Sequence, residues 1–324
     1  MIAPAQIPRA VSRWYPEGPR YWSTRPVRTL RALSHGRVAI HFDPSLPACV
    51  TRWTFSHDLH DGRVVVAFRD QEATSRLLLR WRLLADVIHD LGRIDRSLDV
   101  RDVLIDLSDG VGTDAPPSLL AFARRPGSRA RLMPNPYLLR PRPWLLPPLS
   151  WAFKTDSVYF RGASTGSHDY DANARVTLCR VARSIPRSDC KVSRIKQVSP
   201  AFTARLHADR FIGWRLPIAE MNRHRFLIEA DGNSSSWDRY MLIGSFGGVP
   251  IRFECEWEEC WHDRLIDGVN CVTADRHSLP DVIERLRSRP AEALAIARNA
   301  ARTVSEHLAP AALARQLHAA LISP

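Results

Sequence analysis

Small polar residues and an arginine follow a predicted strand in the segment 224–261. Apolar residues alternate with others up to the turn at Gly232, a pattern that predicts a strand ended by a turn. Ser235 and Ser236 then offer hydroxyl and backbone N–H groups at the start of a predicted helix that carries Arg239. Unpaired N–H groups, the helix dipole and a guanidinium all favour an anion, so the segment predicts a phosphate site. An ordinary capped helix after a strand would show the same residues, and this segment alone leaves both interpretations open.

The segment 157–178 has the same layout. An apolar strand leads to Gly162 and a small-residue turn with Ser164 and Thr165, and Arg175 enters the helix that follows. Ligands of open parallel sheets bind outside the carboxyl ends of the strands. We therefore expect both turns at one edge of one sheet, where they would line a shared ligand site.

Together the two segments resemble glycosyltransferase family 90, which contains bacterial lipopolysaccharide-modifying enzymes, capsule-associated fungal xylosyltransferases and animal protein O-glucosyltransferases. The resemblance spans roughly residues 100–310 and rests on the order and spacing of FRGAST, ADGN and EWEECWHDRL. It implies a GT-B architecture and an inverting transferase. The donor would be a UDP-sugar, and the acceptor a hydroxyl of a glycan, a lipopolysaccharide or a protein.

The expected donor-binding residues are Gly162, Ser164, Thr165, Arg175, Gly232, Ser235, Ser236 and Arg239. The turns would hold the nucleotide, and the two arginines would stabilise the departing diphosphate. The triplet 169–171, Asp-Tyr-Asp, matches the letters of an acidic metal-binding motif but falls in a predicted loop. We therefore expect neither a metal nor another cofactor. The family's arginine lies one position nearer the glycine, where this chain has Asp238, and this departure shifts the expected phosphate contact.

Asp109 is the candidate general base. It follows the predicted strand 102–107 and would lie exposed at the rim of the sheet. Transfer of a sugar to a hydroxyl requires a group that accepts the proton of that hydroxyl, and a carboxylate can do so. The resemblance implies this role, because an aspartate after this strand is the base in the family. Asp-Gly is also a common turn pair, so a turn without a catalytic role is the alternative.

The length of the chain predicts two domains. At 324 residues it exceeds what one hydrophobic core usually supports, so we expect two domains of about 150 residues each. We place a Rossmann-like acceptor-side domain with the base at 1–150, and a Rossmann-like nucleotide-sugar-binding domain with a helical tail at 151–324. An α/β fold with two such domains facing across a cleft agrees with the GT-B architecture that the resemblance implies.

The pattern of elements supports this α/β reading. Residues 62–69 and 102–107 have strand patterns, and a helix face between them, ended by Gly92, carries Leu77, Trp81, Leu84, Ile88 and Leu91. This order predicts a parallel unit with a right-handed crossover. Residues 1–60 show no clear pattern. Further strands are predicted at 157–161, 190–196, 225–230, 249–254 and 270–274, and the chain closes with helices.

A net charge of +12 favours anionic partners. Such a charge could serve a phosphorylated substrate, an anionic membrane surface or nucleic acid, of which we expect nucleic acid least. A non-catalytic basic protein that binds nucleic acid or an anionic glycolipid is therefore the alternative function. The six cysteines show no paired zinc-type spacing and are expected as free thiols. With no long apolar run and no signal peptide in view, we expect a cytoplasmic protein that contacts the inner membrane face at most peripherally.

Overall fold

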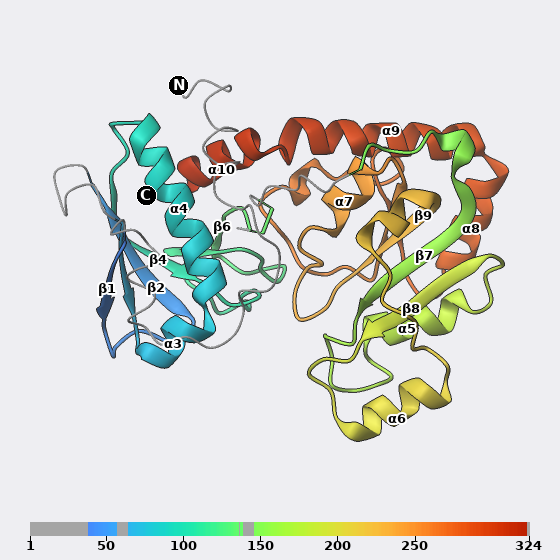
Figure 1. The fold of residues 1–324 in the computed structure, drawn as a ribbon, viewed down its shortest axis with the longest axis horizontal. Coiled ribbons are helices and arrows are strands. Elements are labelled where there is room, and N and C mark those ends of the chain that lie inside the picture. Colours follow the sequence, from blue (N-terminus) through green and yellow to red (C-terminus); the bar gives the residue numbers. More distant parts are fainter. Residues whose placement is uncertain (1–37, 57–63, 136, 139–145, 323–324) are drawn as a thin grey trace. The chain divides into compact units, whose positions relative to one another are not determined.

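The computed structural model describes residues 38–56, 64–135, 137–138 and 146–322, and the chain folds into two compact units (Figure 1). Unit 1 contains Met1–Arg142, Glu258–Cys260 and Ala309–Pro324, and unit 2 contains Pro143–Trp257 and Trp261–Leu308. Both units are α/β and Rossmann-like, which confirms the expected fold class. None of the helices in the described ranges is both long and apolar enough to cross a bilayer.

Unit 1 is built on a six-stranded sheet in the order β1-β3-β2-β4-β5-β6. The strands are β1 (Val38–Phe42), β2 (Val50–Phe55), β3 (Val64–Phe68), β4 (Val100–Asp106), β5 (Leu119–Ala121) and β6 (Arg131–Leu132). The helices α3 (Gln71–Arg76) and α4 (Leu78–Ile94) connect β3 to β4. β2 runs antiparallel to both β3 and β4, and the other pairs are parallel.

The predicted strand–helix–strand of unit 1 is present, but β3 and β4 are not neighbours. They run in the same direction with the antiparallel β2 between them. No strand was predicted at β2, because Thr51, which is buried on the same face as Trp53 and Phe55, is polar and hides the apolar alternation. α4 also continues past Gly92, which is needed for close packing: a Cβ there would lie 2.1 Å from the ring of Phe55.

Unit 2 is built on a five-stranded, fully parallel sheet in the order β11-β10-β9-β7-β8. The strands are β7 (Thr155–Ala163), β8 (Ser188–Arg194), β9 (His224–Ala230), β10 (Val249–Phe253) and β11 (Val272–Ala274). The helices are α5 (Ala174–Ala182), α6 (Pro200–Ala208), α7 (Arg239–Ser245), α8 (Leu279–Ser288) and α9 (Pro290–His307), with short 3-10 turns η3 (Trp151–Phe153), η4 (Ile218–Arg223) and η5 (His262–Arg264). All five strands predicted for this part of the chain are confirmed.

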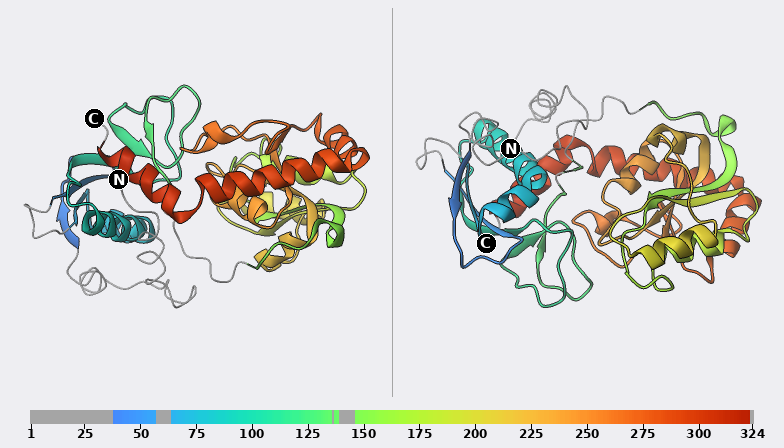
Figure 2. Two further views of the ribbon diagram at one scale, coloured as in Figure 1. Left: turned by 90° about the horizontal axis from the view of Figure 1, so that it is seen from above. Right: turned by 60° about the horizontal axis from the view of Figure 1, so that its bottom comes forward.

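The core of unit 2 explains why its strands are apolar. Phe160, Phe226 and Ile251 of three neighbouring strands are almost completely buried together with side chains of α5, α8 and α9. α9 also packs along α7 and β10 (Figure 2). A parallel sheet covered by helices needs near-continuous apolar strands, which is the pattern that the sequence carries.

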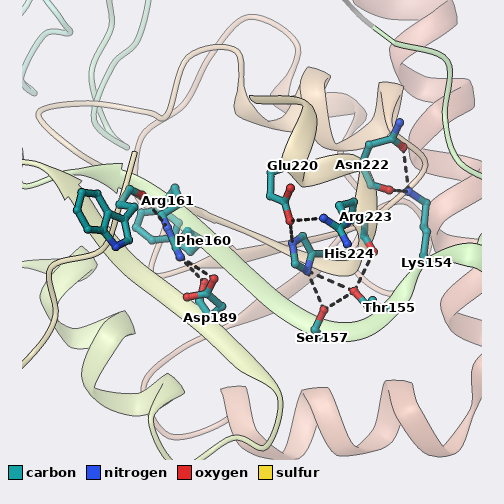
Figure 3. A network of polar contacts seen from close by, with 11 residues as sticks. Lys154, Thr155, Ser157, Phe160, Arg161, Asp189, Glu220, Asn222, Arg223 and His224 are labelled. Atoms are coloured by element: carbon teal, nitrogen blue, oxygen red, sulfur yellow. Dashed lines mark hydrogen bonds and ion pairs between the residues drawn. The ribbon is translucent and has the colours of Figure 1, made fainter. Parts of the chain in front are cut away.

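A polar network fixes the amino ends of β7 and β9 (Figure 3). Lys154 donates from Nζ to the backbone O (2.5 Å) and to Oδ1 (3.2 Å) of Asn222, and burial lowers the pKa of Lys154 to about 8. Ser157 Oγ lies 2.7 Å from Nδ1 of His224. These contacts pair the starts of the two strands, so their carboxyl ends also lie side by side.

The last helix, α10 (Pro310–Ile322), belongs to unit 1, although we expected the helical tail in the second domain. It contacts α4 and β4, and His318 Nε2 lies 2.8 Å from Asp95 Oδ2. Leu313, Leu317 and Leu321 are buried at helical spacing. Such a pattern predicts an amphipathic helix but does not identify the core against which the helix packs.

Candidate functional site

The order of strands in unit 2 reverses at β7. The chain passes from β7 to β8 on one side and then returns to form β9 on the other side of β7 (Figure 1). At such a switch point the loops that follow the two neighbouring strands diverge, and the crevice at their carboxyl ends is the usual ligand site of this fold. The loops are 164–173 after β7 and 231–238 after β9, and they contain the predicted donor-binding residues except Gly162, Arg175 and Arg239.

Gly162 does not form a turn, contrary to the prediction. It lies inside β7, and a Cβ on it would come within 2.6 Å of the ring of Phe160. The turn begins at Ser164, which is buried. Its Oγ donates to the backbone O of Lys196 (2.8 Å) and accepts from the backbone N–H of Lys196 (2.7 Å). Ser164 therefore fastens this turn to the loop after β8.

Arg175 holds the two small-residue turns together. It donates from Nη1 to the O of Ala163 (3.0 Å) and to Oγ1 of Thr165 (2.7 Å), and from Nε and Nη2 to the O of Ala230 (3.3 and 3.2 Å). Gly232 packs against both side chains, since a Cβ there would lie 2.7 Å from Arg175 Nη2 and 2.8 Å from Thr165 Oγ1. The Thr165 and Gly232 turns therefore lie side by side, as predicted.

The electrostatic setting of Arg175 reflects its burial. Burial, and next the nearby guanidinium of Arg239, lower the pKa of Arg175 to about 10. The first N–H groups of α5 are occupied, because Oδ1 of Asn173 accepts from the N–H of Arg175 (3.1 Å) and of Val176 (3.2 Å). Arg175 therefore connects the two turns, and its guanidinium is already engaged by two backbone oxygens and the Thr165 hydroxyl.

A third contact joins the loops after β7, β8 and β9. Gly166, with φ +120°, donates from its N–H to Oδ1 of Asn233 (3.1 Å), and Asn233 donates from Nδ2 to Oε1 of Gln197 (2.8 Å). Non-glycine residues with positive φ also gather at this edge: Gln197 (57°), Trp237 (63°) and Glu254 (48°) follow β8, β9 and β10. Strained backbone of this kind often accompanies functional sites.

The serine segment does not start the helix as predicted. α7 begins at Arg239, and Ser236 Oγ instead donates to Oε1 of Glu229 (2.6 Å). Ser235 is buried, and its Oγ accepts from the N–H of Trp237 (3.4 Å). The loop is therefore shaped by hydrogen bonds among its own side chains before the helix begins.

Arg239 reaches back from α7 to β7. Its Nη2 donates to the O of Arg161 (2.6 Å), and its guanidinium carbon lies 5.0 Å from the centroid of the Phe160 ring. Burial lowers the pKa of Arg239. Nε is buried and has no acceptor among the described residues, so one strong donor of this guanidinium is unused.

Two buried carboxylates, which sequence reasoning did not single out, complete this edge of the sheet. Burial raises the pKa of Asp231 to about 6, and its Oδ2 accepts from the N–H groups of Glu256 (2.7 Å) and Trp257 (3.2 Å). Glu229 Oε2 lies 3.8 Å from Nε of Arg252, its register partner on β10. An acidic residue between the end of a strand and a glycine was the available signal for Asp231.

Asp109 lies just past the carboxyl end of β4 in unit 1, as predicted. Its side chain is partly exposed, and Nη2 of Arg80 on α4 forms an ion pair with Oδ1. Arg80 also donates from Nη1 to the O of Leu107 (2.5 Å). Nearby, burial raises the pKa of Asp106, although its Oδ1 accepts from the N–H of Ser108 (2.6 Å). Asp109 is thus a carboxylate whose orientation is fixed by a guanidinium on the preceding helix.

The acidic triplet 169–171 is not arranged for a metal. Asp171 is engaged by Arg180 (2.7 Å) and Arg205 (3.0 Å), and hydrogen bonding by Arg205 is the main cause that lowers its pKa. Within the described ranges, no three or more His, Cys, Asp and Glu residues gather as metal ligands. All six cysteines are free thiols, as expected.

No family model matches the chain, and no curated protein matches it. Among solved structures it is similar to the C-terminal domain of the glycosyl transferase group 1 family protein LpcC from Francisella tularensis, with 11% identity, a TM-score of 0.35 and coverage of 50% of this chain and 95% of that one. Anabaena HepE in complex with UDP-glucose gives 13% identity, a TM-score of 0.37 and coverage of 48% and 46%. TarM gives 10% identity, a TM-score of 0.40 and coverage of 55% of this chain and 37% of that one. The matches thus span less than half of HepE and of TarM.

Proposed function

We propose that the chain is an inverting glycosyltransferase of the GT-B type and a member of glycosyltransferase family 90. It takes a UDP-sugar at the carboxyl edge of unit 2 and transfers the sugar to a hydroxyl of a glycan, a lipopolysaccharide or a protein. The observation that carries the proposal is the switch point between β7 and β9, where the Thr165 and Gly232 turns are packed together by Arg175. The carboxyl edge of the sheet at such a switch point is the usual nucleotide site of open α/β folds.

The chemistry of this edge suits a nucleoside diphosphate. Gly166 and Gly232 bring the two turns close together, since a Cβ on Gly166 would lie 3.4 Å from the O of Gly232 and a Cβ on Gly232 would lie 2.7 Å from Arg175 Nη2. Thr165 supplies a hydroxyl, and Arg239 supplies a guanidinium whose buried Nε has no acceptor among the described residues. Charge-assisted hydrogen bonds from a guanidinium are about twice as strong as neutral ones, so Arg239 is the side chain best suited to face the diphosphate.

The proposed reaction needs one base and one stabilised leaving group. The carboxylate of Asp109 accepts the proton of the acceptor hydroxyl while the hydroxyl oxygen attacks the anomeric carbon. The bond between that carbon and the β-phosphate oxygen breaks, and its electron pair leaves with UDP. Arg239 stabilises the charge that develops on the diphosphate, and Arg80 keeps Asp109 oriented. Attack opposite to the leaving group inverts the configuration.

Calorimetric titration with UDP, and with uridine for comparison, tests the proposal. With a chelator present we expect UDP to bind and to raise the melting temperature, because a ligand that binds only the folded state stabilises it by mass action. Uridine should bind more weakly, since it lacks the diphosphate. Absence of UDP binding both with and without Mg²⁺ would refute the donor site, and binding only with Mg²⁺ would refute the metal-free mechanism.

A further inference from the structure

Two loops leave the outer edge of the unit 2 sheet side by side. The N–H of Val192 in β8 donates to the O of Phe211 (2.9 Å), and the N–H of Gly213 donates to the O of Val192 (2.9 Å). This pairing is parallel, so both chains leave the sheet at the same end. The segments 194–197 and 214–216 therefore emerge together, and we call them the edge loops.

The edge loops expose apolar side chains. Trp214 is 88% exposed, and Ile195 and Leu216 are 39% and 37% exposed. The main chain is held in place, because the O of Trp214 accepts from Nε of Arg161 (3.3 Å), while the indole projects into solvent. Single exposed apolar residues are ordinary, but three of them in two adjoining loops indicate an interaction surface.

The same region is strongly basic. Between residues 191 and 218 the chain has six basic residues and one acidic residue, Asp209, whose carboxylate accepts a hydrogen bond from the hydroxyl of Tyr170 (2.6 Å). Arg194, Lys196 and Arg215 of the edge loops are exposed, and none of the three forms an ion pair with a described carboxylate. A partner with dense negative charge beside an apolar interior would bind both the basic and the apolar side chains of the edge loops.

We propose that the edge loops dock the protein on an anionic membrane surface. The indole of Trp214 suits the interface between headgroups and acyl chains, and the aliphatic side chains of Leu216 and Ile195 gain from contact with acyl chains. Arg194, Lys196 and Arg215 bind the lipid phosphates. Nucleic acid would stack on the aromatic ring and pair with the basic residues, but it has no use for exposed leucine and isoleucine.

The edge loops also adjoin the loops of the candidate donor site. The backbone of Lys196 bonds to Ser164, and Gln197 accepts from Asn233. If the proposed function holds, an acceptor carried by a membrane lipid would reach the protein on this side. The docking inference itself rests on exposure and charge and stands without the proposed reaction.

Vesicle co-sedimentation of the full chain tests the inference. The probes are vesicles of phosphatidylcholine alone and of phosphatidylcholine mixed with phosphatidylglycerol, at low and high salt. We expect binding to the mixed vesicles, weakened by salt. Trp214→Ser should weaken it about tenfold. Arg215→Glu should weaken it about fivefold or more. The matched controls Ile266→Ser and Arg298→Glu change exposed residues outside the edge loops and should stay within about twofold of the parent.

Three outcomes would overturn the inference. The first is no preference for anionic vesicles, and the second is vesicle binding that Trp214→Ser and Leu216→Ser leave unchanged. The third is an absence of vesicle binding together with self-association or oligonucleotide binding that requires Trp214. This result would assign the edge loops to a second copy of the chain or to nucleic acid. Unchanged melting temperatures would show that the variants fold. UDP binding is measured separately, so a failure of the donor site leaves this test intact.

Discussion

Arg175 of α5 donates two hydrogen bonds, from Nε and Nη2, to the backbone O of Ala230 at the end of β9. The guanidinium crosses the end of β7 to do so and also binds the O of Ala163 there. The sequence predicts that Arg175 binds the diphosphate of the donor. The contacts make Arg175 first of all the residue that shapes the site.

Arg175→Ala should destabilise unit 2 more than an ordinary helix substitution. It leaves the partly buried O of Ala163 and the buried O of Ala230 without their charged donor, and a hydrogen bond to a charged group contributes about 1.5–3 kcal/mol. We expect the free energy of unfolding to fall by about 3 kcal/mol in urea titrations. Arg180→Ala on the same helix removes only an exposed ion pair with Asp171 and should cost about 0–1 kcal/mol. Equal losses of unfolding free energy in the two variants would contradict the structural role of Arg175.

Gly232→Ala should disturb the donor site through contact alone. The new Cβ would lie 2.7 Å from Nη2 of Arg175 and 2.8 Å from Oγ1 of Thr165, so one of the two turns must shift. We expect UDP affinity, measured by calorimetry, to fall by about tenfold, since the ligand contacts depend on both turns. In the control Gly268→Ala the new Cβ would meet nothing within 4 Å, and the φ of 73° at that position strains the new residue, so this variant reports backbone strain without a clash. If both variants bind UDP alike, the contact at Gly232 does not matter for the ligand.

Arg239→Ala distinguishes binding of the diphosphate from binding of the nucleoside. Its guanidinium is the group that we propose binds the diphosphate, and a charge-assisted hydrogen bond contributes about 1.5–3 kcal/mol. UDP should therefore bind about tenfold or more weakly while uridine binds nearly as before. Arg298→Ala on α9 serves as the control for the loss of one positive charge. A parallel loss of UDP and uridine binding would reassign Arg239 to folding.

Asp231 predicts a specific pH dependence of stability. Its folded pKa of about 6 lies above the ordinary value of 3.8, so the folded state binds the proton more tightly than the unfolded state. Its contribution to stability is fully present below pH 3.8 and is lost as the pH rises to about 6, by about 3 kcal/mol. The difference in unfolding free energy between the protein and Asp231→Asn should change by this amount between pH 4 and 6 and then level off. A difference independent of pH would mean that Asp231 titrates normally.

The elements of unit 2 were predictable because their patterns are local. Phe226, Ile228 and Ala230 alternate along β9, and small residues follow the strand. The antiparallel β2 and the assignment of α10 to unit 1 were not predictable, because both depend on partners far away in the chain. Thr51 of β2, for example, is buried through a hydrogen bond to the O of Ile105.

The candidate site was predictable in position but not in its contacts. A small-residue turn after each of two strands identified the edge, since neighbouring parallel strands end at the same edge. The links themselves, such as Arg175 to Ala230 across 55 positions, leave no trace in spacing. The prediction of a turn at Gly162 was wrong because a glycine needed for close packing cannot be told from a turn glycine in a sequence. Gly162 makes room for the Phe160 ring inside β7.

Asp109→Asn tests the proposed chemistry most directly. Asparagine keeps the shape of the side chain and removes the proton acceptor, so transfer should fall by ~10²-fold or more. Asp109 lies in unit 1 and the donor residues lie in unit 2, so UDP affinity should be unchanged. The matched control Asp114→Asn changes an exposed aspartate of the same loop and should leave transfer within a few-fold of the parent.

The turn interpretation of Asp109 predicts the opposite result, because asparagine before glycine is at least as good a turn residue as aspartate. Stability needs a separate measurement, since the substitution also breaks the ion pair with Arg80. Arg80→Gln breaks the same pair but keeps the carboxylate. A variant series in which Arg80→Gln retains more transfer activity than Asp109→Asn, at similar melting temperatures, would identify the carboxylate itself as the proton acceptor. Transfer by Asp109→Asn at the parent rate would remove Asp109 from the mechanism.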